Sequence, residues 1–439
     1  MRAQQAVSGV DSVSLCLRGS LLRVLWGAVV ACSAVLAQDP PKPDARKLVE
    51  RITPADPAAA FDAIGRLADL PAADVEAAAA ALPEDAAFYR NALLAELKVV
   101  AKLGDRYPRE ARVSVAAKDR MPRDILADIL DKSKETVDSG WAFQGPGQPP
   151  ISLQLDDVPF LAALKAFCKE ASVRLQSQVG SLMLYRGGGD LGPTFQFRNY
   201  LLVVTSVVRT RRVVFGAGEK RTLLISATLM CDARSGTIGV ARLESAEAVD
   251  DKGRRFESAP EDREEAPADD LPEAAPNAQL PLTLSIPLKP PEKGVDKIAR
   301  LRGSFSALLP SATSRFTFSE KLEKGTKQSD DHFEVEIERA ATVNRQTTAV
   351  LRVKPKGDMR AFLKLPVQIL AKTKDGPLRP CWTSGRVAKT EVEYTAQRYA
   401  TGEEQMQGRA NEIESVTLLV HRACDERVVW FELRDIPVE

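Results

Sequence analysis

The sequence predicts a multidomain α+β protein with a helical N-terminal part, a small βα-repeat module and two antiparallel β-sandwich domains. Three observations support this fold class. Helical patterns dominate up to about residue 105, a strand-to-helix layout occurs twice between residues 111 and 170, and apolar and polar residues alternate with a period of two from Phe195 onward. Such patterns in succession are typical of helical, α+β and all-β units in one chain.

The composition is that of an ordinary globular protein. The 439 residues include 61 basic and 60 acidic side chains, with 44% hydrophobic and 28% charged residues, and the length suits roughly two to four domains. The near-zero net charge provides no basic face, so we expect no nucleic-acid partner. The two histidines, His332 and His421, are too far apart in the sequence to form a paired-histidine zinc motif.

Residues 1–37 have the pattern of a secretory signal peptide. Arg2, Arg18 and Arg23 precede an apolar run of 14 residues, 24–37, and a proline-rich polar segment follows it. The run is shorter than the about 20 residues that span a bilayer. We therefore expect cleavage after Ala37 and export to the periplasm or the cell surface.

Two alternatives to that cleavage remain open. Cys32 follows Val29, Val30 and Ala31 in a pattern that resembles the lipobox of bacterial lipoproteins, which makes Cys32 a candidate lipidation site. An uncleaved anchor is the other alternative. Apart from a lipid anchor on Cys32 or an uncleaved anchor, we expect no contact with the membrane, because no later run is long and apolar enough to cross it.

Residues 38–110 are predicted to be a tether followed by a helical subdomain. Asp56 and Pro57 form an N-cap and a first-turn proline, and Phe61, Ile64 and Leu67 follow at spacings of three. Further helix starts lie near residues 71 and 83. The alanine-rich faces favour close packing and offer few groups for chemistry.

Residues 111–186 contain the same layout twice. An alternating strand, an aspartate, a proline and an amphipathic helix occur over residues 113–130 and again over residues 151–167. Asp119 and Asp157 are predicted to cap the two helices. A short strand near residue 140 and a closing hairpin complete a small α+β unit.

This region, and in particular the stretch ISLQLDDVPFLAALKAFCKEASV at residues 151–173, is similar to the short N-terminal (STN) domain of secretins and TonB-dependent receptors. The resemblance implies an STN-like fold of two β-α units that serves in signalling or docking. It also implies an accessory or docking role in a secretin or TonB-type transport complex.

Residues 190–312 and 313–439 are predicted to be two β-sandwiches, and we expect them to be duplicated domains. Each half has alternating strands, such as LLISATLMC and HFEVEIERA, a turn containing glycine and a final strand pair. The segment 257–279 holds eight acids and four prolines, which indicates a disordered acidic loop of the first sandwich.

The sequence contains no complete catalytic or cofactor motif of the common classes. A serine-nucleophile elbow, a paired-histidine metalloprotease helix and a phosphate loop are all missing, so we expect no catalytic residue, no cofactor and no metal. Cys381 and Cys424 form the candidate disulfide, because both fall in the last domain of an exported chain. His421 precedes Cys424 by three residues, which leaves a metal site as a weaker alternative.

Two groups of side chains are candidates for a binding surface. If Phe431 points into the core, its neighbour Trp430 points outward, where it could stack on a sugar or a protein partner. Coverage of Trp430 by a neighbouring domain is the alternative. Arg209 and Arg211 lie on a predicted strand and would suit an acidic partner.

Taken together, these features favour a non-catalytic exported envelope protein that acts as a structural or protein-interaction scaffold for an envelope partner. The accessory role in a transport complex is the first alternative. A carbohydrate-binding or carbohydrate-active protein is the second.

Overall fold

The computed structural model describes residues 44–143, 148–178, 181–188, 190–214, 218–258, 275, 282–290, 294–319, 322–343, 346–373, 378–399 and 413–438. The predicted signal peptide, the candidate lipidation site Cys32 and most of the acidic segment 257–279 lie outside these residues.

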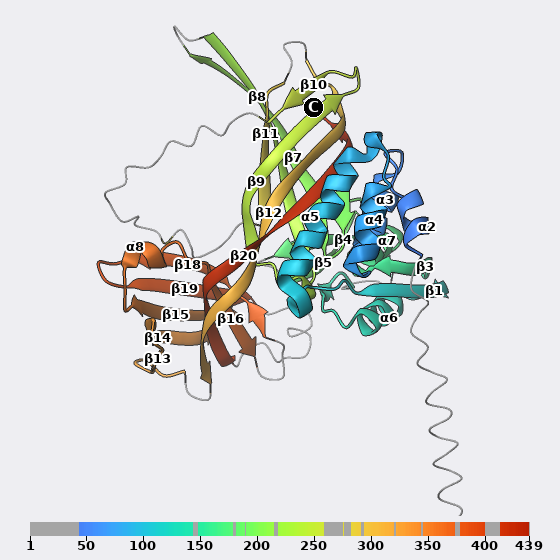
Figure 1. Cartoon of the computed structure of the whole chain (residues 1–439). Coiled ribbons are helices and arrows are strands. Elements are labelled where there is room, and N and C mark those ends of the chain that lie inside the picture. Colours follow the sequence, from blue (N-terminus) through green and yellow to red (C-terminus); the bar gives the residue numbers. More distant parts are fainter. Residues whose placement is uncertain are drawn as a thin grey trace, which may run out of the picture.

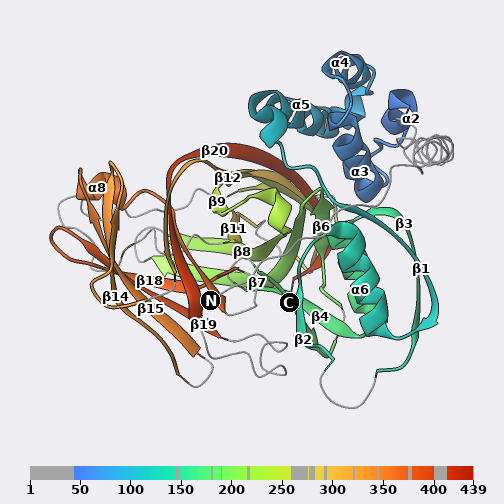
Figure 2. The same cartoon turned by 90° about the horizontal axis from the view of Figure 1, so that it is seen from below.

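The described residues form a mostly β fold, in which the predicted antiparallel sheets are present. Their strands make sheets of two, six, four, five and three strands. Neighbouring strands in this part of the chain pair antiparallel, except for β2 (Asp138–Trp141) with β5 (Ser181–Arg186), which are parallel. The helices and a small module lie at one side of the molecule, and a second sandwich lies at the far end of two long strands (Figures 1 and 2).

Among the described residues, four helices precede the first strand, and two of them contact the first sandwich. The four are α2 (Ala45–Glu50), α3 (Pro57–Ala68), α4 (Ala72–Ala80) and α5 (Ala87–Leu103), with the short 3₁₀ turns η1 (Glu84–Ala86) and η2 (Gly104–Arg106) on either side of α5. The Asp56 side chain accepts a hydrogen bond of 3.0 Å from the Ala59 N–H, and Pro57 opens α3. This is the N-cap that the sequence predicts.

The following module has the element order that the sequence predicts. It contains β1 (Arg112–Arg120), α6 (Pro122–Ser133), β2, β3 (Ile151–Pro159), α7 (Phe160–Glu170), β4 (Val173–Gln178) and β5. β1 pairs with β3, and β5 lies between β2 and β4. Leu126 of α6 and Leu164 and Phe167 of α7 are buried in one hydrophobic cluster with these strands.

The first sandwich packs a four-stranded sheet on part of the six-stranded sheet. The four strands are β6 (Thr194–Phe197), β7 (Tyr200–Val214), β8 (Gly218–Cys231) and β11 (Thr283–Leu288). The opposite layer contains β9 (Gly239–Asp250), β10 (Arg255–Glu257) and parts of β12 (Lys297–Ser319) and β20 (Ile413–Pro437). The 3₁₀ turn η3 (Ala233–Ser235) joins β8 to β9.

The second sandwich uses the other ends of β12 and β20. These ends lie beside β16 (Val367–Thr373) and β17 (Arg379–Pro380). They face a five-stranded sheet of β13 (Lys327–Ser329), β14 (Phe333–Val343), β15 (Gln346–Pro355), β19 (Val392–Tyr399) and β18 (Trp382–Val387). A short helix, α8 (Met359–Phe362), joins β15 to β16.

The long pair of β12 and β20 corrects the predicted boundary between the sandwiches. The two strands pair antiparallel from Lys297 and Pro437 at one end to Ser319 and Ser415 at the other, so residue 312 falls inside a continuous strand. The first sandwich also needs the C-terminal half of β20, which the prediction assigned to residues 313–439. The two predicted halves are therefore not self-contained units.

Helices α3 and α5 share one hydrophobic core with the first sandwich. The Phe61 ring on α3 lies 4.6 Å from the Phe195 ring and 5.5 Å from the Phe197 ring, both on β6, between ring centroids. It also lies 5.6 Å from the Tyr89 ring on α5. Full burial of a side chain such as Phe61 contributes about 1.5–3 kcal/mol. The helices and the first sandwich consequently form one unit, rather than the separate helical subdomain expected over residues 38–110.

Gly303 on β12 is a sensitive point in this unit. A Cβ atom at Gly303 would lie 2.7 Å from Cζ of Phe431 and would also collide with the Ser245 carbonyl. We therefore expect Gly303→Ala to lower the free energy of unfolding by about 1–3 kcal/mol in chemical denaturation. The matched change Gly294→Ala, where nothing lies within 4 Å of the added atom, should shift it by less than about 0.5 kcal/mol. Equal effects of the two changes would contradict the packing of β12 described here.

Candidate functional site

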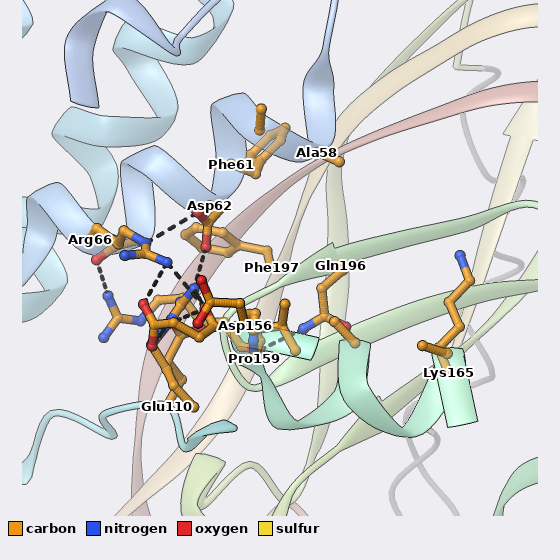
Figure 3. A pocket seen from close by; sticks show the side chains of 18 of the residues that line it. Ala58, Phe61, Asp62, Arg66, Glu110, Asp156, Pro159, Lys165, Gln196 and Phe197 are labelled. Atoms are coloured by element: carbon orange, nitrogen blue, oxygen red, sulfur yellow. Dashed lines mark hydrogen bonds and ion pairs between the residues drawn. The ribbon is translucent and has the colours of Figure 1, made fainter. Parts of the chain in front are cut away.

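The main candidate site is a cavity of about 750 Å³ where α3, α7 and the start of the first sandwich meet (Figure 3). Its apolar lining comes from all three parts and includes Ala58, Val158, Pro159, Ala162, Leu191 and Phe197. Charged side chains surround this lining. Concave sites with an apolar surface and a few polar groups are typical of ligand binding.

The Asp62 carboxylate on α3 organises one end of the cavity. It accepts hydrogen bonds from the guanidinium groups of Arg51 at 3.1 Å, Arg66 at 3.2 Å and Arg112 at 2.9 Å. Arg112 is the first residue of β1, so this carboxylate ties the helices to the module. A carboxylate with three guanidinium partners is an anchor for those partners and is poorly suited to act as a free acid or base.

Asp157 supplies a second acceptor from the module side. Its carboxylate lies 2.8 Å from Nη2 of Arg66 and 3.1 Å from Nε of Arg112, and its backbone carbonyl accepts hydrogen bonds from the same two arginines. The residue has a left-handed backbone with φ of 47°, and Asp119 at the same point of the first strand-helix unit has φ of 51°. Both residues lie inside their strands, where the pairing between β1 and β3 shifts register, so this geometry accommodates β-bulges.

The predicted capping roles of Asp119 and Asp157 are wrong. The residues at the two N-cap positions are Met121 and Pro159, and neither makes a side-chain capping hydrogen bond. Pro122 opens α6, as expected from its position. The aspartates occupy the bulges of β1 and β3 and, at Asp157, the ion-pair network.

Glu110 is another acidic group at this end. It forms an ion pair with Arg112. Burial raises the pKa of the Glu110 carboxyl, although the positive charge of Arg112 opposes the shift. The pair therefore lies in a partly desolvated part of the cavity wall.

Two lysines of α7 line the same cavity away from these ion pairs. Lys165 and Lys169 are four residues apart, so both side chains project from one face of the helix. Figure 3 shows Lys165 on the opposite side of the cavity from Asp62 and Arg66. Nζ of Lys165 donates a hydrogen bond to Oγ1 of Thr194, and Asp190 lines the same cavity. Desolvation lowers the pKa of Lys165, an effect that Asp190 opposes and Lys169 strengthens.

Arg198 forms part of the cavity wall, and its side chain extends into the protein interior. Its guanidinium donates to the Asp69 carboxylate at 2.9 Å and to the Gly65 carbonyl, both at the α3 side. The packing at Gly65 is tight, because an added Cβ would lie 3.2 Å from Cγ of Arg198. The arginine side chain is fully buried, and Nε lies 3.8 Å from Oε1 of Glu96.

Glu96 on α5 is the centre of a buried ionic cluster behind the cavity. Its carboxylate is the ion-pair partner of Arg427 on β20 and accepts a hydrogen bond from the Tyr107 hydroxyl. Glu96 is 1% exposed and Arg427 is 0% exposed. Desolvation opposes the charge of Arg427, but Glu96 and the neighbouring tyrosines more than offset this effect, so its pKa is raised. The cluster joins α5, β20 and the cavity wall.

A second buried ionic cluster surrounds Glu432, which lies on β20 like Arg427. Its carboxylate accepts hydrogen bonds from the Tyr89 hydroxyl on α5 at 2.8 Å and from Nε of Arg302 on β12 at 2.7 Å. Nε of Arg434 donates to the other oxygen at 2.8 Å. The helix α5, which lies along β20 in Figure 1, is therefore held to the long strand pair by charged groups at two places.

A third polar cluster lies between the module and the first sandwich. Asp232, 4% exposed, accepts hydrogen bonds from Nδ2 of Asn199 at 2.8 Å and from the Ser235 N–H at 2.9 Å. Glu135 of the module pairs with Arg234 at 3.0 Å. Burial raises the pKa of Asp232 to about 7; Glu135 adds to the shift, while Asn199 and Arg234 oppose it.

The structure places Trp430 beneath a helix. The Trp430 ring contacts the Phe88 ring of α5 with a centroid distance of 5.3 Å, while Phe431 on the neighbouring face is fully buried. Trp430 remains half-buried beside a crevice of about 500 Å³ between α5 and β20. The sequence analysis gave coverage of Trp430 by a neighbouring domain as the alternative. In the structure, helix α5 partly covers Trp430.

The arginines proposed with Trp430 lie in a different sheet. Arg209 is on β7, and its guanidinium donates to the carbonyl of Val438 at 3.0 Å and to that of Val295. Arg209 therefore fixes the end of the chain. Arg211 is exposed two residues further along β7. The structure does not combine Trp430, Arg209 and Arg211 into one surface.

The predicted disulfide between Cys381 and Cys424 is not formed, and all four described cysteines are free thiols. Cys381 is 4% exposed in the core of the second sandwich, where burial raises its pKa to about 12. Cys424 lies opposite Pro310, where the register between β12 and β20 shifts. The prediction failed because it placed both residues in one domain, whereas β20 passes from one sandwich to the other.

The histidines are also separated. His421 is buried, with Nδ1 2.9 Å from Oγ1 of Thr313, and burial lowers its pKa to about 4. Nε2 of His332 lies 2.5 Å from Nη1 of Arg422. Within the described residues, no three His, Cys, Asp or Glu side chains are grouped so that they could hold a metal ion.

No protein-family model, curated protein or solved structure matches the chain. In the part of the chain that the structure describes, no helix is both long and apolar enough to span a membrane.

The charged groups around the cavity and behind it were not identified from the sequence. Arg66, Arg112 and Arg198 look like ordinary surface residues in a sequence with 28% charged residues. The burial of Arg427 could have been predicted from the sequence. Arg427, Val429 and Phe431 alternate with a period of two, so they point to the same, buried face of the strand. A charge at a core position indicates a buried ion pair.

The pKa of Asp232 predicts a pH dependence of stability. The folded protein binds this proton more tightly than the unfolded chain does, since the pKa rises from 3.8 to about 7. The stabilisation is fully present below the ordinary aspartate pKa and is lost as pH rises through about 7. We expect the free energy of unfolding of the wild type, relative to Asp232→Asn, to fall from about pH 4 to about pH 7 and then level off.

Asp251→Asn is the matched control, because Asp251 is exposed in a turn. The free energy of unfolding of the Asp251→Asn variant should change with pH in the same way as that of the wild type. Parallel curves for the wild type and Asp232→Asn would contradict the buried environment of Asp232.

Proposed function

We propose that this chain is a non-catalytic, exported envelope protein that binds a segment of a partner protein in the cavity between α3, α7 and β6. The observation that carries the proposal is the distribution of charge around the cavity. The Asp62 carboxylate is engaged by three arginines at one end, and Lys165 and Lys169 line the other side of an apolar surface.

The lysines favour a partner segment with an acidic side chain next to an apolar one. An acid would offset the mutual repulsion of Lys165 and Lys169, and an apolar side chain would cover Ala162 and Leu191. The partly desolvated setting that lowers the pKa of Lys165 would strengthen such a pair relative to one on an open surface.

Binding accounts for the charged residues better than catalysis does. A general acid or base must be free to exchange a proton with a substrate. Asp62 and Asp157 instead hold arginines from two different parts of the fold. These groups give the cavity a fixed shape, which lowers the entropic cost of binding.

The envelope location rests on residues 1–37. The basic start, the apolar run and the small-residue exit favour export, with either a free N-terminus after Ala37 or a lipid on Cys32. The partner would then be another protein of the periplasm or the cell surface.

A docking role in a secretin or TonB-type complex is the second candidate. It is supported by the strand and helix order of residues 112–186, which agrees with the STN-like resemblance, and by the buried core that these elements share. Helix α7 of this module forms one wall of the cavity, so both candidates use the same site. The carbohydrate alternative has weaker support, because Trp430 is half-buried and contacts the Phe88 ring of α5.

A selection from a phage-displayed peptide library tests the proposal. Peptides that bind the full chain should be enriched in sequences with an acidic residue beside an apolar one. The double change Lys165→Glu and Lys169→Glu should weaken their binding at least about tenfold, equivalent to about 1.4 kcal/mol, because it replaces attraction by repulsion. Titration by fluorescence anisotropy measures this loss.

Lys118→Glu is the matched control, since Lys118 is an exposed lysine of the same module outside the cavity. It should leave the affinity within about twofold of the wild type. Binding that is equally insensitive to Lys165→Glu and Lys169→Glu would exclude the cavity as the binding site.

A further inference from the structure

The two sandwiches share the strands β12 and β20 but have separate hydrophobic cores. Phe305 of β12 and Val429 of β20 belong to the core of the first sandwich. Phe316 and Leu418, from the same two strands, belong to the core of the second. No described residue belongs to both cores. The middle of the strand pair therefore joins two separately packed bodies, which lie at opposite ends of the pair in Figure 1.

Between the two cores, the described parts of β12 and β20 pair only with each other. β9 pairs with β12 no further than Leu308, and β16 pairs with β20 no further than Val420. Residues 309–313 and 421–425 thus form a two-stranded ribbon. No third strand stiffens this ribbon on either side, and an isolated pair of strands is only marginally stable.

Both strands are irregular in the middle of this ribbon. The residues that lie opposite each other there are Pro310 with Cys424, Ala312 with Ala423 and Thr313 with His421. Ser311 on β12 and Arg422 on β20 therefore have no opposing residue, so each strand contains a bulge, and the bulges are one residue pair apart. Pro310 also has no backbone N–H and cannot donate a ladder hydrogen bond. We call residues 310–312 and 422–424 the pivot.

Little side-chain packing opposes bending at the pivot. Three of its residues are exposed and three are half-buried, in the order Ser311, Arg422 and Ala423, then Pro310, Ala312 and Cys424. None of the six belongs to either sandwich core. A segment with few buried apolar contacts and an interrupted ladder belongs to the least stable parts of a fold.

The ribbon is held firmly on the side of the first sandwich. Leu309 packs in a small buried cluster with Leu103, at the end of α5, and Tyr107. The Asp425 carboxylate lies 2.8 Å from Nζ of Lys102 on the same helix. These contacts fix the ribbon immediately before the pivot on β12 and immediately after it on β20.

The ribbon is also held on the side of the second sandwich. The buried His421 donates its backbone N–H to the Pro366 carbonyl at 2.9 Å, and its Nδ1 lies 2.9 Å from Oγ1 of Thr313. Bending is therefore confined to the few residues between Leu309 and Thr313 and between His421 and Asp425.

The connection between β10 and β11 also reaches the second sandwich. The Ala275 N–H donates to the Gly385 carbonyl of β18 at 2.9 Å, and Ala275 is buried in the second core. This contact ties the two bodies together without pairing their strands. The ribbon remains the hydrogen-bonded joint between their sheets.

We propose that the pivot is a hinge about which the second sandwich rotates relative to the unit that contains the cavity. The two bulges and the missing proline N–H allow the backbone to bend, and the contacts of Leu309, Asp425 and His421 limit the motion to the pivot. Hinges of this kind absorb domain motions in a few residues. The hinge is independent of the proposed function, because all residues that line the cavity lie on the side of the first sandwich.

Double electron–electron resonance on the full chain tests the proposal. Ser206 on β7 and Lys354 on β15 are exposed residues of the two sandwiches, and Asp251 is an exposed residue of the first. Replacing pairs of them by p-acetylphenylalanine allows nitroxide labelling without changing a cysteine. We expect the distance distribution between positions 206 and 354 to be at least about twice as wide as the one between positions 206 and 251. Anything narrower would overturn the proposal.

A glycine pair tests the position of the hinge. Ala312→Gly with Ala423→Gly should widen the distribution between positions 206 and 354 by at least about half, because glycine frees the backbone. Ala340→Gly with Ala341→Gly is the matched control, since these two alanines are half-buried on β14, away from the ribbon. It should leave the distribution unchanged. An unchanged distribution in the pivot variant, or equal widening in both variants, would overturn the proposal.

Discussion

The fold depends on one buried carboxylate. Glu96 lies on α5 with Arg427 of β20 on one side and Arg198 of the cavity wall on the other. Removing each ion from water costs several kcal/mol, and only good geometry and further hydrogen bonds offset that cost. Tyr107 and Tyr200 supply hydroxyl groups to the same cluster. The charges are therefore stable inside the protein only while helix, strand pair and cavity wall are docked together, so the cluster specifies how these parts meet.

The strand pair of β12 and β20 extends this constraint to the rest of the molecule. It supplies Arg427 and Glu432 to the helices, a layer to the first sandwich and a layer to the second. The module is joined to this body through Asp62, Asp157 and the cluster at Asp232. The cavity lies where these connections converge. Its walls come from segments that are distant in the sequence, and ion pairs hold them together.

Local features of this fold could be predicted from the sequence, but its long-range pairings could not. Period-two alternation identified strands, and the Asp56-Pro57 pair identified the start of α3. Alternation does not reveal which strand a given strand pairs with, so it predicts a domain boundary near residue 312, inside the continuous pair of β12 and β20. The error about Cys381 and Cys424 followed from that boundary. The cavity was missed because its residues are ordinary charged and small side chains, which become a site only through tertiary contacts.

A double-mutant cycle on Glu96 and Arg427 tests the central claim most directly. Each single change, Glu96→Gln or Arg427→Met, should lower the free energy of unfolding by about 3–5 kcal/mol, since it leaves a buried group without its partner. The double change should cost clearly less than the sum, because both charges are then gone. Costs that add within about 0.5 kcal/mol would show that the two groups do not depend on each other and would contradict the account.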